Sequence, residues 1–366
     1  MNKTTAIVLL LSLFYQLSYS QSKIVDSKTG EAVAFAHLII DGGKLGAASD
    51  INGMVSISEI ERIVKDTTAV ITIQHLGYDN LEISLQALKQ SDIIRLNGRD
   101  IVLPEVTVSP TADYDHIVLK GYFRSYQTDD KELKYYTDGI VEYYFPRKKK
   151  QFWVNLLEHR SFRNQVLIDQ TKQRSAMVIM TVAGIPYMDG NTIIDELNKK
   201  YTFTDAANGQ DIMKSNSKVG YIRKNENENT VQINIDKILP EKEEVHSLFG
   251  YTSRIQHIEI TENYISDNFQ SPKIDDLESR KEYREIIFGH KKDTAEVAIE
   301  VIHEFYVMER KYVTKKEIKE LELSAYSGLR ESSEYTYEYW KDLTRYGIPP
   351  LSRQIEEELG KSLTRY

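Results

Sequence analysis

The chain has 366 residues, with 47 lysines and arginines against 55 aspartates and glutamates, and a formal net charge of −8 at pH 7. This acidic excess argues against general nucleic-acid binding, which needs a basic surface. The sequence contains no cysteine, so disulfides, thiolate catalysis, thiolate metal sites and a lipid anchor attached to cysteine are excluded.

The first twenty residues have the pattern of a secretory signal peptide. A positively charged start precedes a mostly apolar run over 6–15, and the small residues Ser18 and Ser20 stand before Gln21. This pattern predicts a signal peptide at 1–20, cleaved between Ser20 and Gln21. The apolar run is shorter than the ~20 residues of a spanning helix, and a retained N-terminal anchor stays open as the alternative. No later segment is long and apolar enough to predict a spanning helix.

Residues 21–109 alternate short apolar runs with turn residues, which predicts a β-sandwich of about seven strands. Asp50, Asn52 and Gly53 stand close together, as ligands of a calcium loop would. Asn-Gly between two extended runs instead predicts a tight hairpin turn, because both residues tolerate positive φ. A calcium loop of the EF-hand type would need further oxygen ligands and a closing glutamate. We therefore expect a turn, with calcium as the alternative.

A family resemblance rests on four stretches of this region: TGEAVAFAHLII, LGAASDINGMVSI, ITIQHLGYDNLEISL and LPEVTVSP. Together they resemble the carboxypeptidase-regulatory-like domain, a transthyretin-like sandwich found at the N-termini of exported Bacteroidota proteins. The resemblance covers 21–109 and implies that the glycines and Asp50 support the fold. It implies an accessory domain and not a peptidase.

Residues 110–116 read as a linker, and 117–366 as a larger sheet-rich domain. Long strand patterns are interrupted by two predicted helices, at 191–200 and 351–363. This order loosely resembles the curved half-barrel of periplasmic lipoprotein carriers. We therefore expect a mostly β chain: a transthyretin-like sandwich, then a curved antiparallel sheet whose concave side is partly covered by both helices.

The clearest strand pattern runs from Val297 to Phe305. Val297, Ile299 and Val301 lie on one face, and three glutamates, among them Glu300 and Glu304, lie on the other. We expect the aliphatic face to point into the interior and substitution of Glu300 to be nearly silent.

No motif predicts catalysis or a cofactor. His303-Glu304 begins like H-E-x-x-H, but Val307 stands where the second histidine should be, and the segment reads as a strand. The chain has no G-x-S-x-G, P-loop or G-x-G-x-x-G. His257 and Glu259 share a strand face and could hold a metal, although a partly buried, hydrogen-bonded histidine is the simpler interpretation. We therefore predict no catalytic residue, metal or cofactor.

One charge run stands out, and its residues are Arg147, Lys148, Lys149 and Lys150. Aromatic residues border it, including Trp153. Basic residues beside aromatics can bind anionic headgroups or phosphates, so these five residues form the candidate binding site. A solvated hairpin tip, where lysines discourage edge pairing, is the alternative.

The sequence therefore favours an exported, non-enzymatic envelope protein, located in the periplasm or at the outer membrane. Its ligand would be an apolar molecule, a glycan or lipid, or an envelope protein. The rival hypothesis is a hydrolase with dispersed catalytic residues in the C-terminal domain. A deep pocket with converging His, Asp or Ser would favour the hydrolase, whereas an apolar trough or aromatic patch would favour binding.

Overall fold

The computed structural model describes most of the chain beyond the predicted signal peptide. The described residues are 21–99, 105–107, 114–147, 152–174, 182–188, 193–197, 200–206, 208–225, 229–236, 245–248, 250–266, 268–291, 295–319, 321, 323 and 332–366. The predicted signal peptide, most of the predicted linker and lysines 148–150 lie outside these ranges. No helix in the described part is long and apolar enough to cross a membrane.

An N-terminal β-sandwich packs two sheets, ordered β4–β1–β7 and β3–β2–β5–β6, around a shared apolar core. Ile24 of one sheet and Leu38 and Ile71 of the other are fully buried in this core. The strands are β1 (Gln21–Asp26), β2 (His37–Ile40), β3 (Lys44–Ala48), β4 (Met54–Ser56), β5 (Val70–Gln74), β6 (Leu81–Ser84) and β7 (Ile93–Leu96). Two short helices that were not predicted, α2 (Ile57–Ile63) and α3 (Leu85–Gln90), complete the domain.

The segment around Asp50 is a turn, but it is not a hairpin. Asp50 Oδ1 accepts hydrogen bonds from the backbone N–H groups of Asn52 and Met54, both at 2.8 Å. Gly53 has φ +78°, and a Cβ there would lie 2.5 Å from the carbonyl oxygen of Ile24. The flanking strands β3 and β4 enter different sheets, so the turn carries the chain from one layer of the sandwich to the other.

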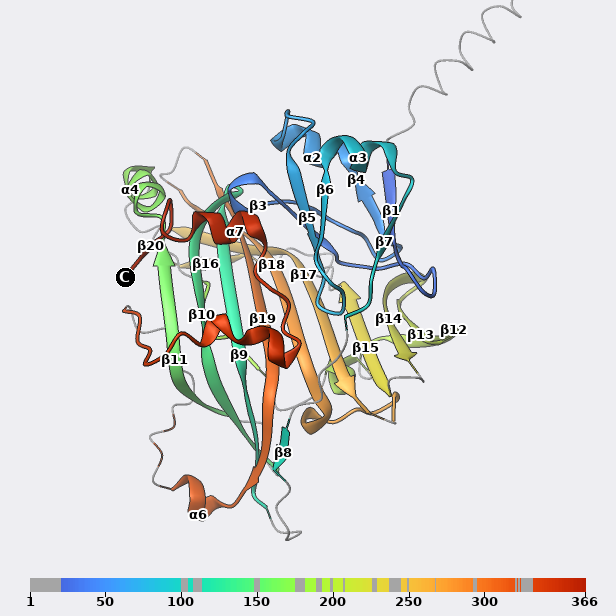
Figure 1. The fold of residues 1–366 in the computed structure, drawn as a ribbon, viewed down its shortest axis with the longest axis vertical. Coiled ribbons are helices and arrows are strands. Elements are labelled where there is room, and N and C mark those ends of the chain that lie inside the picture. The colour runs from blue at the N-terminus through green and yellow to red at the C-terminus, as the bar shows by residue number, and fades with distance from the viewer. Residues whose placement is uncertain are drawn as a thin grey trace, which may run out of the picture.

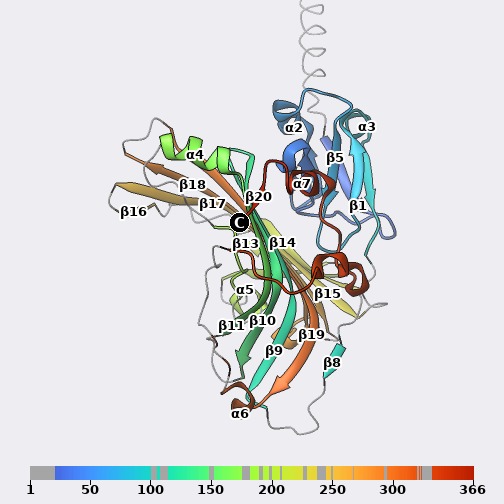
Figure 2. The same cartoon turned by 60° about the vertical axis from the view of Figure 1, so that its left-hand side comes forward.

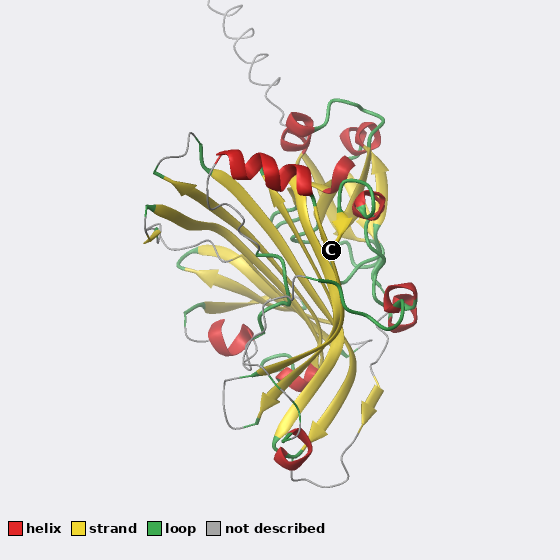
Figure 3. Ribbon diagram, turned by 90° about the vertical axis from the view of Figure 1, so that its left-hand side faces the viewer, coloured by secondary structure: helices red, strands yellow, loops and turns green. Residues whose placement is uncertain are grey.

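The large C-terminal sheet is open and antiparallel along its main path (Figure 1). It is strongly curved when viewed along its edge (Figure 3). Its strand order is β12–β13–β14–β15–β17–β18–β19–β9–β10–β11–β20. These strands are β9 (His116–Asp129), β10 (Glu132–Pro146), β11 (Trp153–Arg163), β12 (Thr202–Ala206), β13 (Gly209–Lys214), β14 (Ser217–Asn225), β15 (Thr230–Asp236), β17 (Tyr251–Ile265), β18 (Leu277–His290), β19 (Val297–Val313) and β20 (Thr364–Arg365). The predicted mostly β fold, a sandwich followed by a larger curved sheet, is confirmed.

Two further strands pair with this sheet beside its main path. Strand β16 (His246–Leu248) pairs with β17, and β8 (Glu105–Thr107) pairs in parallel with β19. The segment containing β8 was expected to complete the sandwich, but it joins the large sheet instead.

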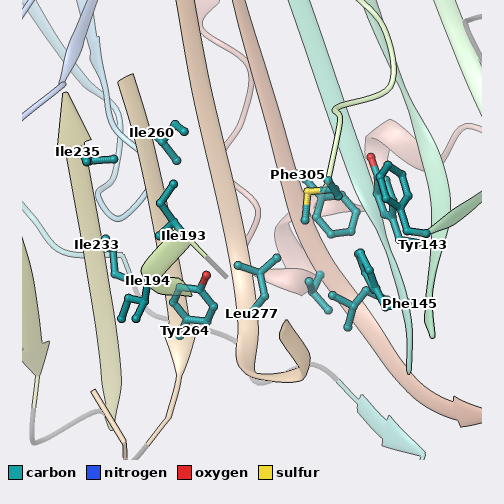
Figure 4. Packing of buried hydrophobic residues seen from close by; sticks show 14 of the residues in the cluster. Tyr143, Phe145, Ile193, Ile194, Ile233, Ile235, Ile260, Tyr264, Leu277 and Phe305 are labelled. Atoms are coloured by element: carbon teal, nitrogen blue, oxygen red, sulfur yellow. The ribbon is translucent and has the colours of Figure 1, made fainter. Parts of the chain in front are cut away.

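The concave face of the large sheet carries the largest apolar cluster. Helix α5 (Ile193–Leu197) lies within the predicted helix and packs Ile193 and Ile194 against strands β15 and β17 (Figure 4). Val297, Ile299 and Val301 are buried on this side, as predicted. Burial of such side chains is worth ~1.5–3 kcal/mol each, so this face of β19 stabilises the sheet.

The convex face is also buried, which corrects one prediction. Glu300 and Glu304 are only 2% and 1% exposed, although the alternation placed them on a face that was expected to be solvated. The N-terminal domain and the end of the chain cover this face. A change at Glu300 is therefore not expected to be silent, because a buried carboxylate with partners cannot be altered freely.

A row of buried polar side chains crosses the convex face from one strand to the next. In the order β15, β17, β18, β19, β9, β10 and β11, its members are Asn234, Thr261, Lys281, Glu304, Arg124, Asp138 and Arg160. Arg124 Nε donates to Glu304, and Arg160 Nε donates to Asp138 Oδ1 at 2.9 Å. Most of the charges in this row are thus neutralised by a neighbour on the adjacent strand.

A C-terminal strap, residues 332–366, crosses the same face and joins the two domains. Tyr339 donates to Asp138 Oδ1 at 2.7 Å, and Gln354 accepts a hydrogen bond of 2.6 Å from Thr72 of the sandwich. Strand β20 then pairs with β11 at the edge of the sheet. Helix α7 (Arg353–Glu358) belongs to this strap and lies with the sandwich on the opposite side of the sheet from α5 (Figure 2). The prediction that the C-terminal helix covers the concave side is therefore wrong.

The remaining helices lie at the ends of long strands. Helix α4 (Gln165–Arg174) follows β11, and α6 (Lys315–Ile318) follows β19. Neither helix was predicted.

Candidate functional site

An interdomain crevice of about 390 Å³ lies where the sandwich meets the convex face of the large sheet. The large sheet contributes Asp236, His257, Glu259, Tyr283, Glu285 and Glu300, and the β9–β10 turn contributes Lys131. The sandwich contributes Phe35, His37, Leu45, Gly46, Ala47, Ala48, Ser49, Asp50 and Glu59. Charged and imidazole groups therefore dominate the sheet side of the crevice, and small side chains dominate the sandwich side.

Strand alternation places His37 in the crevice. Leu38 and Ile40 of β2 point into the core of the sandwich, so His37 and Ile39 point the other way, toward the large sheet. The ring of His37 lies 5.0 Å from that of Tyr283, centroid to centroid. A histidine in a strand that is otherwise apolar is thus buried at an interface between domains.

Four titratable side chains form a chain of close contacts at this point. His257 Nε2 lies 2.8 Å from Asp236 Oδ1 and 3.6 Å from Glu259 Oε1. On the other side of the same carboxylate, His37 Nε2 lies 3.2 Å from Glu259 Oε2. That last contact is close but lacks hydrogen-bond geometry, so both atoms are buried without a hydrogen-bond partner among the described residues.

A second group surrounds Glu300. Its carboxylate accepts hydrogen bonds from Lys131 Nζ at 2.6 Å, Tyr283 Oη at 2.9 Å and Thr128 Oγ1 at 3.2 Å. Lys131 reaches this carboxylate from a turn in which Asp130 and Lys131 both have positive φ, +49° and +72°. The turn therefore places one ammonium group at the edge of the crevice.

Burial and neighbouring charges shift the pKa values of Glu259, His37 and His257 in different directions. Burial is the main cause that raises the pKa of Glu259 to about 7, and the nearby charge of Asp236 adds to it. Burial lowers the pKa of His37 well below its ordinary value, so His37 is neutral near pH 7. Burial also acts to lower the pKa of His257, but the bond to Asp236 and the charge of Glu259 outweigh it and raise this pKa. The crevice thus holds a carboxyl group with a pKa of about 7 beside an imidazole whose protonated form is stabilised.

The positions of the two imidazoles argue against a metal site at His257 and Glu259. The two imidazoles approach different oxygens of Glu259, so they do not converge on one point. Within the described ranges, no three His, Asp or Glu side chains are arranged to hold a metal ion.

The predicted anion site lies at the other end of strand β10. The guanidinium of Arg147 stacks on Tyr114 at 4.8 Å, and the ring of Trp153 lies 5.6 Å from that of His116. Lysines 148–150 are outside the described residues, so anion binding at this end stays a prediction.

Sequence reasoning had paired His257 with Glu259 but missed the other members of the crevice. His37 and Asp236 come from segments far from each other in the chain, and only the docking of the two domains brings them together. Ser49 also lines the crevice, but its hydroxyl accepts from the backbone of Ala36 at 2.9 Å and donates to Val33 at 2.8 Å. Histidine and carboxylate groups therefore converge here, whereas Ser49 is committed to the backbone.

No protein-family model and no curated protein sequence matches this chain. Two similar solved structures are a lipovitellin, studied for its lipid–protein interactions, and DynF from the dynemicin biosynthesis pathway of Micromonospora chersina. The lipovitellin match has 10% identity and a TM-score of 0.25, and it covers 60% of this chain and 26% of the other. The DynF match has 10% identity and a TM-score of 0.18, and it covers 60% of this chain and 95% of the other. TM-scores this low do not establish a shared fold.

Proposed function

We propose that the protein is an exported, non-enzymatic binding protein of the cell envelope and that its ligand occupies the interdomain crevice. The supporting observation is the set of buried, ionisable groups that face the crevice from both domains. Ligand sites favour such junctions, and charged groups are costly to bury unless they have a partner. The four stretches resembling the carboxypeptidase-regulatory-like domain support the assignment to the Bacteroidota envelope.

Native mass spectrometry of protein purified from the envelope fraction tests this function. We expect a bound ligand on the wild type and none on Ala48→Trp, since Ala48 lines the crevice and a large side chain there would fill it. Tyr337→Ala is the control, because Tyr337 is 54% exposed and lies outside the crevice. If Ala48→Trp retains the ligand while folded, the crevice is not the binding site.

A hydrolase is the second candidate, and the convergence of histidine and carboxylate groups in the crevice favours it. Glu259, whose pKa burial raises to about 7, could act as a general acid near neutral pH. If the protein hydrolyses model glycosides or esters, Glu259→Gln should abolish turnover while exposed Glu356→Gln keeps it. Equal rates in the two variants would exclude Glu259 as the acid.

A further inference from the structure

The charge balance of the crevice is strongly negative. Six acidic side chains line it: Asp50, Glu59, Asp236, Glu259, Glu285 and Glu300. Glu259, whose pKa burial raises to about 7, is partly ionised at neutral pH. Against them stand Lys131 and two imidazoles, of which His37 is neutral because burial lowers its pKa. An acidic lining attracts cationic ligands and repels anionic ones.

Two buried side chains in this lining each have one polar atom without a hydrogen-bond partner among the described residues. Glu259 is 6% exposed and His37 is 2% exposed, and both face the crevice. Glu259 Oε2 accepts no hydrogen bond from any described residue, and His37 Nε2 makes none. A buried carboxylate oxygen without a donor costs free energy, and a ligand that donates a charge-assisted hydrogen bond would recover it.

Lys131 shows how the crevice holds a cation. Its ammonium lies 2.6 Å from Glu300 Oε1, where the hydroxyl of Tyr283 also donates. Lys131 itself is 41% exposed, whereas Glu300 is only 3% exposed at its side chain. The buried carboxylate of Glu300 is therefore paired with a partly exposed lysine, and another cation could displace the ammonium group of that lysine.

We propose that the crevice binds an organic cation, a primary ammonium or guanidinium group, through Glu259 and Glu300, with Lys131 as an internal competitor. This inference rests on the proposed binding function and names the chemical class of its ligand. A multidentate metal ion fits less well, because the imidazoles of His37 and His257 approach opposite oxygens of Glu259. A free diamine and a lysine side chain of a partner both carry such a cation, and the two share the same recognition chemistry.

Titration calorimetry at low ionic strength tests the proposal with three probes. Cadaverine represents a free diamine, and Nα-acetyl-lysine methylamide represents a lysine in a peptide. Nα-acetyl-norleucine methylamide has the same aliphatic stem without charge. We expect at least one cationic probe to bind and the norleucine probe not to bind. Preference for cadaverine or for the lysine probe distinguishes the two sources.

Charge variants then locate the site. Glu259→Gln and Glu300→Gln should each weaken binding about tenfold or more, whereas Lys131→Gln should tighten it, because it removes the internal competitor. Glu356→Gln, an exposed charge change outside the crevice, should leave affinity unchanged. Lys131 is partly exposed, so its variant stays informative even if Glu300→Gln fails to fold.

Three results would overturn the cation assignment: binding of neither cationic probe, equal binding of the norleucine probe, or no tightening in Lys131→Gln. Stoichiometric zinc binding that is lost in His257→Ala would replace it with a metal site. A neutral ligand that copurifies and is excluded by Ala48→Trp would leave the proposed binding function intact while the cation proposal fails.

Discussion

The buried ion pair between Arg124 and Glu304 makes the sharpest prediction about stability. Arg124 is fully buried, and Glu304 is 1% exposed, so neither charge is solvated. Glu304→Gln keeps the shape of the side chain but leaves the guanidinium without its counter-charge. Removing one partner of such a pair costs about 3–5 kcal/mol. Because Arg124 also donates to the carbonyl of Pro349 at 2.9 Å, we expect the lower end, about 3 kcal/mol.

A matched control lies on the same strand. Glu309 forms ion pairs with Lys120 at 3.6 Å and Lys311 at 2.8 Å. The side chains of Glu309, Lys120 and Lys311 are 23%, 32% and 38% exposed. Glu309→Gln should therefore cost less than about 1 kcal/mol, since solvent screens these pairs. Replacing Arg124 and Glu304 together by methionine should recover most of the loss, because no unpaired charge remains.

Urea unfolding followed by tryptophan fluorescence provides the assay. The two tryptophans report on separate regions, Trp153 on strand β11 and Trp340 on the strap. If Glu304→Gln and Glu309→Gln shift the unfolding midpoint equally, the Arg124–Glu304 pair does not stabilise the protein as a buried ion pair. That result would refute the claim that buried charges on the convex face are costly to leave unpaired.

Three further predictions concern other parts of the molecule. Burial, with the charges of Lys281 and Arg99, lowers the pKa of His75 from 6.5 to about 3. The free energy of unfolding should therefore fall as the pH drops from about 6.5 toward 3, by at most ~1.4 kcal/mol per pH unit. His75→Gln should flatten this dependence, and an unchanged slope would contradict the prediction. Ile299→Asp should prevent stable folding, because Ile299 is fully buried in an apolar cluster, and a soluble variant with native circular dichroism would show otherwise. Changing lysines 148–150 together to glutamine should weaken binding to anionic vesicles without lowering the melting temperature, and unchanged vesicle binding would exclude the anion hypothesis.

Some features of the fold could be read from local sequence patterns. The alternation from Val297 to Phe305 predicted a strand with a buried aliphatic face, and that face is buried. Asn52 and Gly53 predicted a turn, and Gly53 has the positive φ that such a turn requires. These properties depend on neighbouring residues and on the period of the backbone, so the sequence alone was sufficient.

Other features depended on which segments meet. The same alternation assigned Glu300 and Glu304 to a solvated face, because a period of two cannot show that a second layer covers the sheet. That layer is made by the sandwich and the C-terminal strap, which dock through contacts between residues distant in the chain.

The sequence by itself determined that the chain is mostly β, where several strands and turns lie, and that it lacks cysteine chemistry. Only the tertiary structure decided that His37 of the sandwich lies 3.2 Å from Glu259 of the large sheet. The physical reason is that a crevice forms from the docking of two domains. Each residue that lines the crevice belongs to a sequence pattern that also occurs in ordinary buried strands. The pKa of Glu259 rises only when docking of the two domains removes water from around its carboxyl group.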